Sequence, residues 1–328
     1  MRAVWMGLGA CSMVAAAVAC SGTANQEAGF AATDGGSSGG NSGSSGGGSS
    51  GASSSGGLLG DGGGAGSSSG GGSGCTGQAA DFVYVLSAEN VLYSFAPNQK
   101  LFTKIGTLGC TTPLSPNSMA VDRNAVAYVN YVADDDSVGQ IFQVSTTDAS
   151  CTGPIMTMPT GWERVGMGYS TNNAGSSTET LYVAGVGAVG GGMGLGLVDF
   201  GIDNVGPIGP FTGTLAGQNA ELTGTGSGTL FGFFTSSPVE VAQIDKTNGS
   251  TMTPVQMAGV QVPNDWAFSF WGGHFYLYTS QGEGMGDGSN VTDYDPVADS
   301  VNTSFMTGIG FDIVGAGVST CAPTTAPQ

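Results

Sequence analysis

Five degenerate copies of one pattern run through the C-terminal part of this chain and constrain its fold more than any other feature. Each copy contains an apolar segment followed by Asp or another turn residue, as in LYSFAP, IFQVST, LGLVDF, VAQIDK and VTDYDP. One apolar position marks the copies at Phe95, Val144, Val198, Ile244 and Tyr294, at steps of 49, 54, 46 and 50 residues. A period of roughly 20–50 residues is typical of repeat folds, in which each unit buries its apolar face against its neighbours.

Each copy extends into four short segments that are rich in Val, Phe, Tyr and Thr and are separated by Gly, Asn and Asp. The second copy, for example, reads SMAVD, VAYVNYV and GQIFQVS, followed by a short segment at 154–158. Alternating apolar and polar residues between such turns favour antiparallel strands. No stretch after residue 80 has the helical period.

The first and last parts of the repeat region complement each other. The first copy contains only three segments, DFVYVLS, NVLYSFA and FTKIGTL, and the chain ends with an unpaired one, Ile313–Thr320. Together they complete a fifth sheet. We therefore predict an all-β, five-bladed β-propeller over residues 81–321, closed by pairing of the C-terminal strand with the N-terminal blade. A flat β-solenoid is the alternative, but its caps need no complementary partial repeats.

The N-terminus predicts export. Residues 1–19 contain Arg2, an apolar run and no acidic residue, and they are too short to span a membrane, which is typical of a signal peptide. The segment Ala17–Cys20 resembles the lipobox of bacterial lipoproteins, in which the cysteine is lipidated and becomes the first mature residue. We expect lipidation at Cys20, with ordinary signal-peptidase cleavage as the alternative. Leu8–Cys11 fits the same pattern but leaves almost no apolar segment before it.

Residues 20–80 predict a disordered tether. Between Gly35 and Gly74, 34 of 40 residues are Gly or Ser, a composition that cannot bury enough apolar surface to fold. As a Gly-rich coil, the segment from Cys20 to Cys75 has a root-mean-square reach of about 40 Å. We expect an exported cell-envelope lipoprotein, in the outer membrane or at the cell surface rather than in the inner membrane, with residues 322–328 as a C-terminal tail.

The cysteines left after export predict two disulfides, because an even number in an oxidising compartment favours pairing. Of the three possible pairings we predict Cys75–Cys321, which brackets the repeats, and Cys110–Cys151, which joins neighbouring blades. A zinc site is disfavoured because the chain has no C-x-x-C spacing and its only histidine is His274.

The charge of the chain excludes several partners. Removal of Arg2 with the signal peptide leaves five basic residues against 24 acidic ones, a formal charge of 5 − 24 = −19. Nucleic-acid binding requires basic stripes that replace phosphate counterions, so no nucleic acid is expected. Anionic lipid surfaces are disfavoured for the same reason, and the lipid anchor is the only membrane contact that we expect. Solubility outside the cell explains the charge, with an acidic docking surface for a cationic partner as the alternative. We expect a monomer.

Two motifs resemble catalytic or nucleotide-binding signatures. Gly185–Gly190 has the spacing of a dinucleotide fingerprint, but the chain continues through more glycines into another strand, so the helix that such a site needs is missing and we interpret it as a loop. His274, the only available histidine base, follows Trp271-Gly272-Gly273, which predicts a tight turn. We therefore assign no catalytic residue.

One acidic segment raises the question of calcium. Its oxygen-bearing side chains are Asp287, Asn290, Asp293 and Asp295, in a spacing that does not match the EF-hand loop. Asp295 shares its place in the repeat with Asp199 and Asp245, where the side chain is expected to cap a turn. We expect an acidic loop and no cofactor, with calcium as the open alternative.

The topology itself predicts a ligand site. In a propeller the segments that lead into the innermost strands converge on one face around the central channel. In this chain those segments carry amides, carboxylates, an arginine and two indoles, which suit hydroxyl-rich or amphipathic ligands. The predicted ligand-binding residues are Asn117, Trp162, Glu163, Arg164, Asn219, Glu221, Asp265, Trp266 and Asp312. The alternative is that they are polar only because water fills the opening.

Residues 81–321, together with the lipobox-like segment and the tether, resemble secreted bacterial β-propeller lipoproteins of uncharacterised function. We predict a membrane-tethered, non-catalytic binding propeller whose ligand is a carbohydrate or an envelope protein. Five-bladed glycosidases are similar in architecture, and their inner-strand carboxylates act as acid and base. A carbohydrate-active hydrolase is therefore the alternative, with Glu221, Asp265, Asp312 and Asp122 as its candidate carboxylates. Architecture alone does not assign such an activity.

Overall fold

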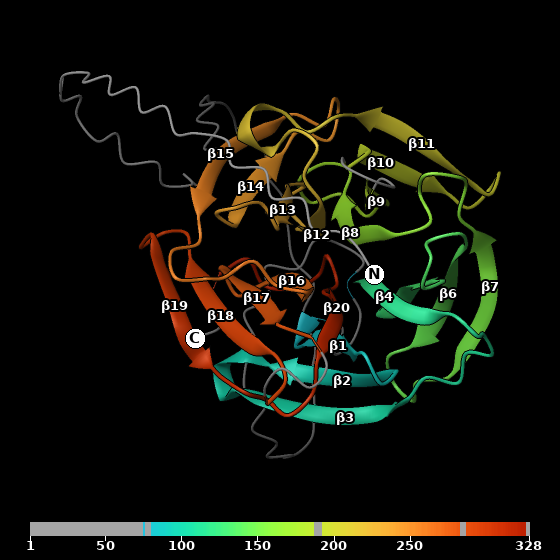
Figure 1. Cartoon of the computed structure of the whole chain (residues 1–328), viewed down its shortest axis with the longest axis horizontal. Coiled ribbons are helices and arrows are strands. Elements are labelled where there is room, and N and C mark those ends of the chain that lie inside the picture. Colours follow the sequence, from blue (N-terminus) through green and yellow to red (C-terminus); the bar gives the residue numbers. More distant parts are fainter. Residues whose placement is uncertain (1–74, 76–79, 187–191, 283–286, 326–328) are drawn as a thin grey trace, which may run out of the picture.

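Five four-stranded antiparallel sheets surround a central axis in the computed structural model, which describes residues 75, 80–186, 192–282 and 287–325 (Figure 1). This confirms the predicted all-β, five-bladed propeller. The described residues contain strands, turns and short 3-10 segments such as Pro97–Gln99, and none of them forms an apolar helix of membrane-spanning length.

The blades follow one another in chain order around the ring. From its innermost to its outermost strand, blade 1 contains β20 (Ile313–Gly317), β1 (Val83–Ser87), β2 (Val91–Ala96) and β3 (Leu101–Thr107). In the same direction, blade 2 contains β4 (Ser115–Val121), β5 (Val126–Val132), β6 (Gly139–Ser145) and β7 (Cys151–Thr157). Blade 3 contains β8 (Val165–Thr171), β9 (Glu179–Gly185), β10 (Gly194–Asp199) and β11 (Asn204–Gly209). Blade 4 contains β12 (Ala220–Gly224), β13 (Leu230–Phe234), β14 (Glu240–Ile244) and β15 (Thr251–Gln256), and blade 5 contains β16 (Asp265–Trp271), β17 (His274–Ser280), β18 (Asn290–Asp295) and β19 (Ser300–Met306).

The ring closes as the sequence predicts. Strand β20 pairs antiparallel with β1, so that Tyr84 lies opposite Gly317 and Leu86 opposite Gly315. The inner strands β20, β4, β8, β12 and β16 contact one another in turn around the axis (Figure 1). The last strand of the chain therefore completes the first blade.

The five positions that mark the repeat occupy equivalent places in the five blades. Phe95, Val144, Val198, Ile244 and Tyr294 all lie in the third strand from the axis and are at most 7 % exposed. The repeat is thus the pattern of one buried strand. The turn that follows it is capped in several blades, because the side chains of Asp199, Asp245 and Asp295 each accept a hydrogen bond from the backbone amide two residues later.

Glycine lets the inner strands approach more closely than side chains would permit. A Cβ atom added to Gly166 would lie 2.0 Å from the carbonyl oxygen of Ala220, and one added to Gly224 would lie 2.2 Å from that of Tyr169. Side-chain hydroxyls then join neighbouring inner strands, since the Met167 amide donates to Ser118 Oγ at 3.1 Å. The centre of the ring is consequently tightly packed.

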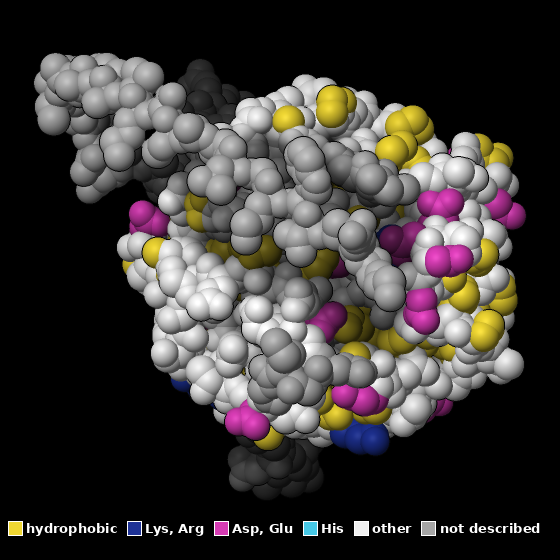
Figure 2. Space-filling view, viewed as in Figure 1, with side chains coloured by type: hydrophobic (Ala, Val, Ile, Leu, Met, Phe, Trp, Pro, Cys, Tyr) yellow, Lys and Arg dark blue, Asp and Glu magenta, His cyan; other side chains and the backbone are white. Residues whose placement is uncertain are grey.

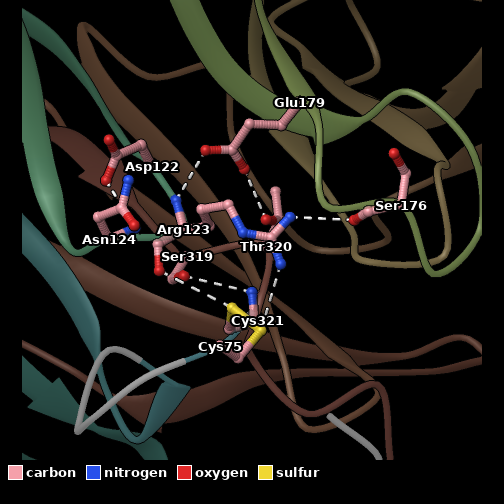
Figure 3. The surroundings of a disulfide bond; sticks show 9 residues. All are labelled: Cys75, Asp122, Arg123, Asn124, Ser176, Glu179, Ser319, Thr320 and Cys321. Atoms are coloured by element: carbon pink, nitrogen blue, oxygen red, sulfur yellow. Dashed lines mark hydrogen bonds between the residues drawn. A yellow bond between two sulfur atoms is a disulfide. The ribbon is translucent and has the colours of Figure 1, made fainter. Parts of the chain in front are cut away.

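Both predicted disulfides are present, Cys75–Cys321 and Cys110–Cys151. Cys151 is the first residue of β7, so the second bridge ties the segment after β3 to the outermost strand of the next blade. Around the first bridge, the Arg123 backbone amide donates to Glu179 at 2.8 Å and the Thr320 hydroxyl donates to the same carboxylate at 2.6 Å (Figure 3).

Some of the predictions fall outside the described residues. These are the signal peptide, the lipidation site Cys20, nearly all of the tether, residues 187–191 of the glycine-rich connection and residues 326–328 of the tail. The strands on either side of the glycine-rich connection, β9 and β10, pair directly with each other.

Candidate functional site

All nine predicted ligand-binding residues lie at one end of the propeller. We call this end the top face, defined by the starts of the five inner strands, and the opposite end the bottom face. Arg164, Asn219 and Asp312 directly precede β8, β12 and β20, while Asp265 is the first residue of β16. The topology therefore places these residues, which are far apart in the chain, at the same end of the ring.

Arg164 is the centre of a polar network between blades 2 and 3. Its Nη1 donates to Asn117 Oδ1 at 2.5 Å, and its Nε donates to Asp136 Oδ1 at 2.8 Å. Asn117 Nδ2 in turn donates to Asn130 Oδ1 at 2.9 Å and to the Val165 carbonyl at 2.9 Å. The ion pair is partly exposed, so it orients the guanidinium and contributes little stability.

The sequence reasoning missed two members of this network. Asn130 is fully buried in β5, and its Nδ2 donates to the Glu163 carbonyl at 3.1 Å. The signal for it was a single amide inside the apolar segment VAYVNYV, because a buried amide requires a partner. Asp136 lies in the connection between β5 and β6, and no local pattern links it to Arg164.

The two tryptophans belong largely to the packing between blades. Trp162 is 5 % exposed and packs with Val165 and Met167 in the core between blades 2 and 3. Trp266 packs against the core between blades 4 and 5, and its Nε1 is buried without a hydrogen-bond partner among the described residues. Trp162 therefore offers no open indole face to a ligand. Glu163 beside it accepts a hydrogen bond from the Gly161 amide at 2.8 Å.

Glu221 lies inside the ring and not on the open surface. Its side chain on β12 is 4 % exposed, and it accepts a hydrogen bond at 2.8 Å from Ser118 Oγ on β4. Burial raises the pKa of Glu221 well above its ordinary value because it desolvates the carboxylate, and the opposing hydrogen bonds from Ser118 and the Met167 amide do not offset this effect. This placement favours the protonated form.

The remaining predicted residues are spread around the top face. Asp265 accepts a hydrogen bond from Ser280 Oγ at 3.1 Å. Asp312 is 8 % exposed, and its carbonyl accepts from the Ala88 amide at 2.9 Å. The carbonyl of Asn219 accepts from the Thr235 amide at 3.3 Å.

The segment considered for calcium is in part a strand, because β18 begins at Asn290. Asp293 lies 2.8 Å from His274 Nδ1, and Asp295 caps the following turn. The described residues contain no group of three His, Cys, Asp or Glu side chains placed to hold a metal ion. The predicted turn before His274 is present, with positive φ at both Gly272 and Gly273.

A cleft of about 600 Å³ opens on the top face of blade 5, beside Asp265. Its walls come from the connection between β15 and β16, the top ends of β17 and β18, and the outer strand β19. The lining residues are Gly259, Val260, Gln261, Thr279, Ser280, Gln281, Asp287, Gly288, Asn290, Thr292, Thr303, Thr307 and Gly308. Of the predicted residues, Asp265 is bonded to this wall, through Ser280.

The charge on the surface agrees with the composition. Figure 2 shows Asp and Glu side chains dispersed over the face in view and Lys or Arg at only a few points. Arg123, one of the six Lys and Arg residues of the chain, is 8 % exposed and donates to the Ser176 carbonyl at 3.0 Å. Such a basic residue is not available to an anionic partner.

Comparisons with known proteins show weak structural similarity to several solved structures and assign no activity to this chain. No protein-family profile matches the chain, and no curated protein does. Among solved structures, a protein of unknown function from Bacteroides caccae is 10 % identical with a TM-score of 0.38, covering 72 % of this chain and 97 % of that one. A luciferin-regenerating enzyme is 12 % identical with a TM-score of 0.40, covering 63 % and 83 %. A gluconolactonase from Xanthomonas campestris is 11 % identical with a TM-score of 0.38, covering 60 % and 68 %.

Proposed function

We propose that this protein is a tethered, non-catalytic binding propeller of the cell envelope that binds a carbohydrate on its top face. The observation that carries the proposal is the cleft on that face, which lies at the end of the ring where the predicted polar residues also gather. The volume of the cleft is typical of ligand sites.

The attachment of the tether supports this orientation. Cys75 is bonded to Cys321, which follows the bottom end of β20. The chain therefore reaches the propeller at its bottom face, and the top face with the cleft lies at the other end of the ring. A propeller anchored through residue 20 can present its cleft away from the membrane.

The positions of the carboxylates favour binding over hydrolysis. A glycosidase requires two carboxyl groups that face the same glycosidic bond. Glu221 is buried and bonded to Ser118, whereas Asp122 lies at the bottom end of β4, where its Oδ1 accepts from the amides of Asn124 and Val126 at 2.9 and 2.8 Å. These two groups are committed to structural hydrogen bonds, which supports the non-catalytic interpretation.

Export and anchoring are part of the proposal. The two disulfides support an oxidising compartment, and the segment before Cys20 supports lipidation. Expression of the wild-type chain and a Cys20→Ala variant in a bacterial host, followed by mass spectrometry of the N-terminal peptide, tests this step. We expect an acylated Cys20 in the membrane fraction and release of the variant. An unmodified Cys20 in a soluble protein would refute the anchor.

Affinity electrophoresis of the full chain in gels that contain neutral or acidic polysaccharides tests the proposed function. We expect retardation by at least one neutral polysaccharide, with no release of reducing ends during incubation. Release of reducing ends that is lost on Glu221→Gln would overturn the non-catalytic interpretation. Unchanged mobility in every gel would overturn carbohydrate binding and leave an envelope protein as the predicted ligand.

A further inference from the structure

Blade 5 differs from the other blades on the top face. The connection between its second and third strands, residues 281–289, is the longest of the five, the others being 88–90, 133–138, 186–193 and 235–239. The described part of this connection, together with Gly259–Gln261 from the preceding connection, borders the cleft. This connection is one residue longer than its counterpart in blade 3, and what distinguishes blade 5 is the cleft that the described part of the connection borders.

The face of blade 5 that packs on blade 4 changes its chemistry along its length. Three successive cross-strand pairs of β17 and β18 lie on this face: Phe275 with Tyr294, Leu277 with Thr292, and Thr279 with Asn290. The first pair and Leu277 belong to the apolar core between the blades. The side chains nearer the top face are Thr and Asn, and these line the cleft. The cleft is therefore the polar continuation of a core interface.

Two of the threonines at this wall, Thr279 and Thr292, are buried as residues, but their hydroxyls open onto the cleft. Thr279 is 8 % exposed and Thr292 is 3 % exposed, yet neither side chain makes a hydrogen bond to any of the described residues. The hydroxyls of Thr303 and Thr307, which also line the cleft, are likewise unbonded within the described ranges. Among the described residues only Trp266 Nε1 is both buried and unpartnered, so these hydroxyls reach solvent in the cleft and can hydrogen-bond to a bound group.

The composition of the wall limits the chemical class of that group. Asp287 is the only charged side chain that lines the cleft among the described residues, and no Lys, Arg or aromatic side chain does so. A polyanion would meet Asp287 in a chain of strong negative charge, and an apolar ligand would bury the hydroxyls without partners. We propose that this cleft, on the proposed binding face, holds a segment of a neutral saccharide chain through the hydroxyls of Thr279 and Thr292.

The test uses the full chain, isotopically labelled, with the neutral probes cellohexaose, laminarihexaose and maltohexaose and the acidic probe hexagalacturonate. We expect a neutral hexaose to shift the amide signals of residues 279–281 and 290–292. Thr279→Val and Thr292→Val should each weaken its binding about 2- to 12-fold, the effect of losing one hydrogen bond, without lowering the urea midpoint. Thr157→Val, which removes an exposed hydroxyl at the top end of β7, is the matched control and should leave binding unchanged.

The outcomes separate this inference from the proposed function. Two results would overturn the cleft assignment and leave binding on the top face standing. One is amide shifts confined to the region of Asn117 and Arg164. The other is equal retardation of the wild type and both valine variants in the polysaccharide gels. Binding of the acidic probe alone, or of no hexaose up to about 10 mM, would overturn the assignment to a neutral saccharide.

Discussion

The two disulfides close loops of very different length, and their removal should have correspondingly different costs. Cys75 and Cys321 are 246 residues apart in the chain, and Cys110 and Cys151 are 41 residues apart. The chain-entropy relation gives about 5.5 kcal/mol for the first loop and about 3.9 kcal/mol for the second. Residual structure in the unfolded chain lowers both figures. The expected difference, about 1.6 kcal/mol in favour of the longer loop, depends only on the logarithm of the length ratio.

The measurement compares two double variants, each of which retains one disulfide. Adding reductant to Cys110→Ala/Cys151→Ala breaks only Cys75–Cys321, and adding it to Cys75→Ala/Cys321→Ala breaks only Cys110–Cys151. Because each protein is its own reference, loss of cysteine packing cancels. Urea unfolding should show the larger loss of unfolding free energy in the first case, and thermal unfolding a decrease on the order of 10 °C.

A smaller loss for the longer loop, with unchanged m-values, would refute this reasoning. It would show that the two ends of the chain already lie close together in the unfolded ensemble, or that the Cys75–Cys321 bridge is strained in the folded ring, so that its stabilisation falls below the chain-entropy value. A changed m-value would instead show that the unfolded states of the two variants differ in compactness.

Three further predictions concern the ring. Burial raises the folded-state pKa of Glu221, so the contribution of this residue to stability is full below the ordinary pKa of about 4.3 and is lost as pH rises through the folded-state value. Glu221→Gln should therefore stabilise the protein progressively more between pH 4 and 8 in urea titrations. An equal effect of the substitution at all pH values would contradict this. Gly166→Ala should cost at least about 2 kcal/mol in unfolding free energy because its Cβ would meet a backbone oxygen, whereas Gly109→Ala, which meets nothing within 4 Å, should be near neutral in the same assay. Truncation after Gly310 removes β20 and should produce aggregation by exposing the edge of β1, whereas removal of the residues before Gly74 should leave the melting temperature unchanged. If the chain truncated after Gly310 stays monomeric with an unchanged melting temperature, ring closure by β20 is ruled out.

Much of the fold was predictable because local, repeated sequence patterns determine it. The spacing of Phe95, Val144, Val198, Ile244 and Tyr294 reports one buried strand in every blade, and the orphan segment at Ile313–Thr320 reports how the ring closes. The two disulfides followed from the same reasoning, since the ends of a closed ring and adjacent blades must lie close together.

The site was predictable only to the level of a face. Alternation along a strand tells which side of the sheet a residue is on, but not how far it lies from solvent in the ring. For that reason Glu221 and Trp162 were assigned to the top face, where they lie, but their burial was not foreseen. Thr279 and Thr292 were missed because their neighbours in the cleft come from other segments, and a lone threonine in a strand has no distinguishing signal.

The bridge between Cys75 and Cys321 has a mechanical consequence when the chain before residue 75 is pulled. Tension applied to the chain before residue 75 passes through the sulfur atoms to the end of β20 as well as along the backbone to β1. Strands β1 and β20 are neighbours in one sheet, so the load is shared by the two ends of the chain where they meet. Peeling of the first blade, the ordinary way in which a pulled terminus unravels a repeat protein, is thereby opposed by a covalent bond. The ring should therefore stay closed under shear for as long as the Cys75–Cys321 disulfide is intact.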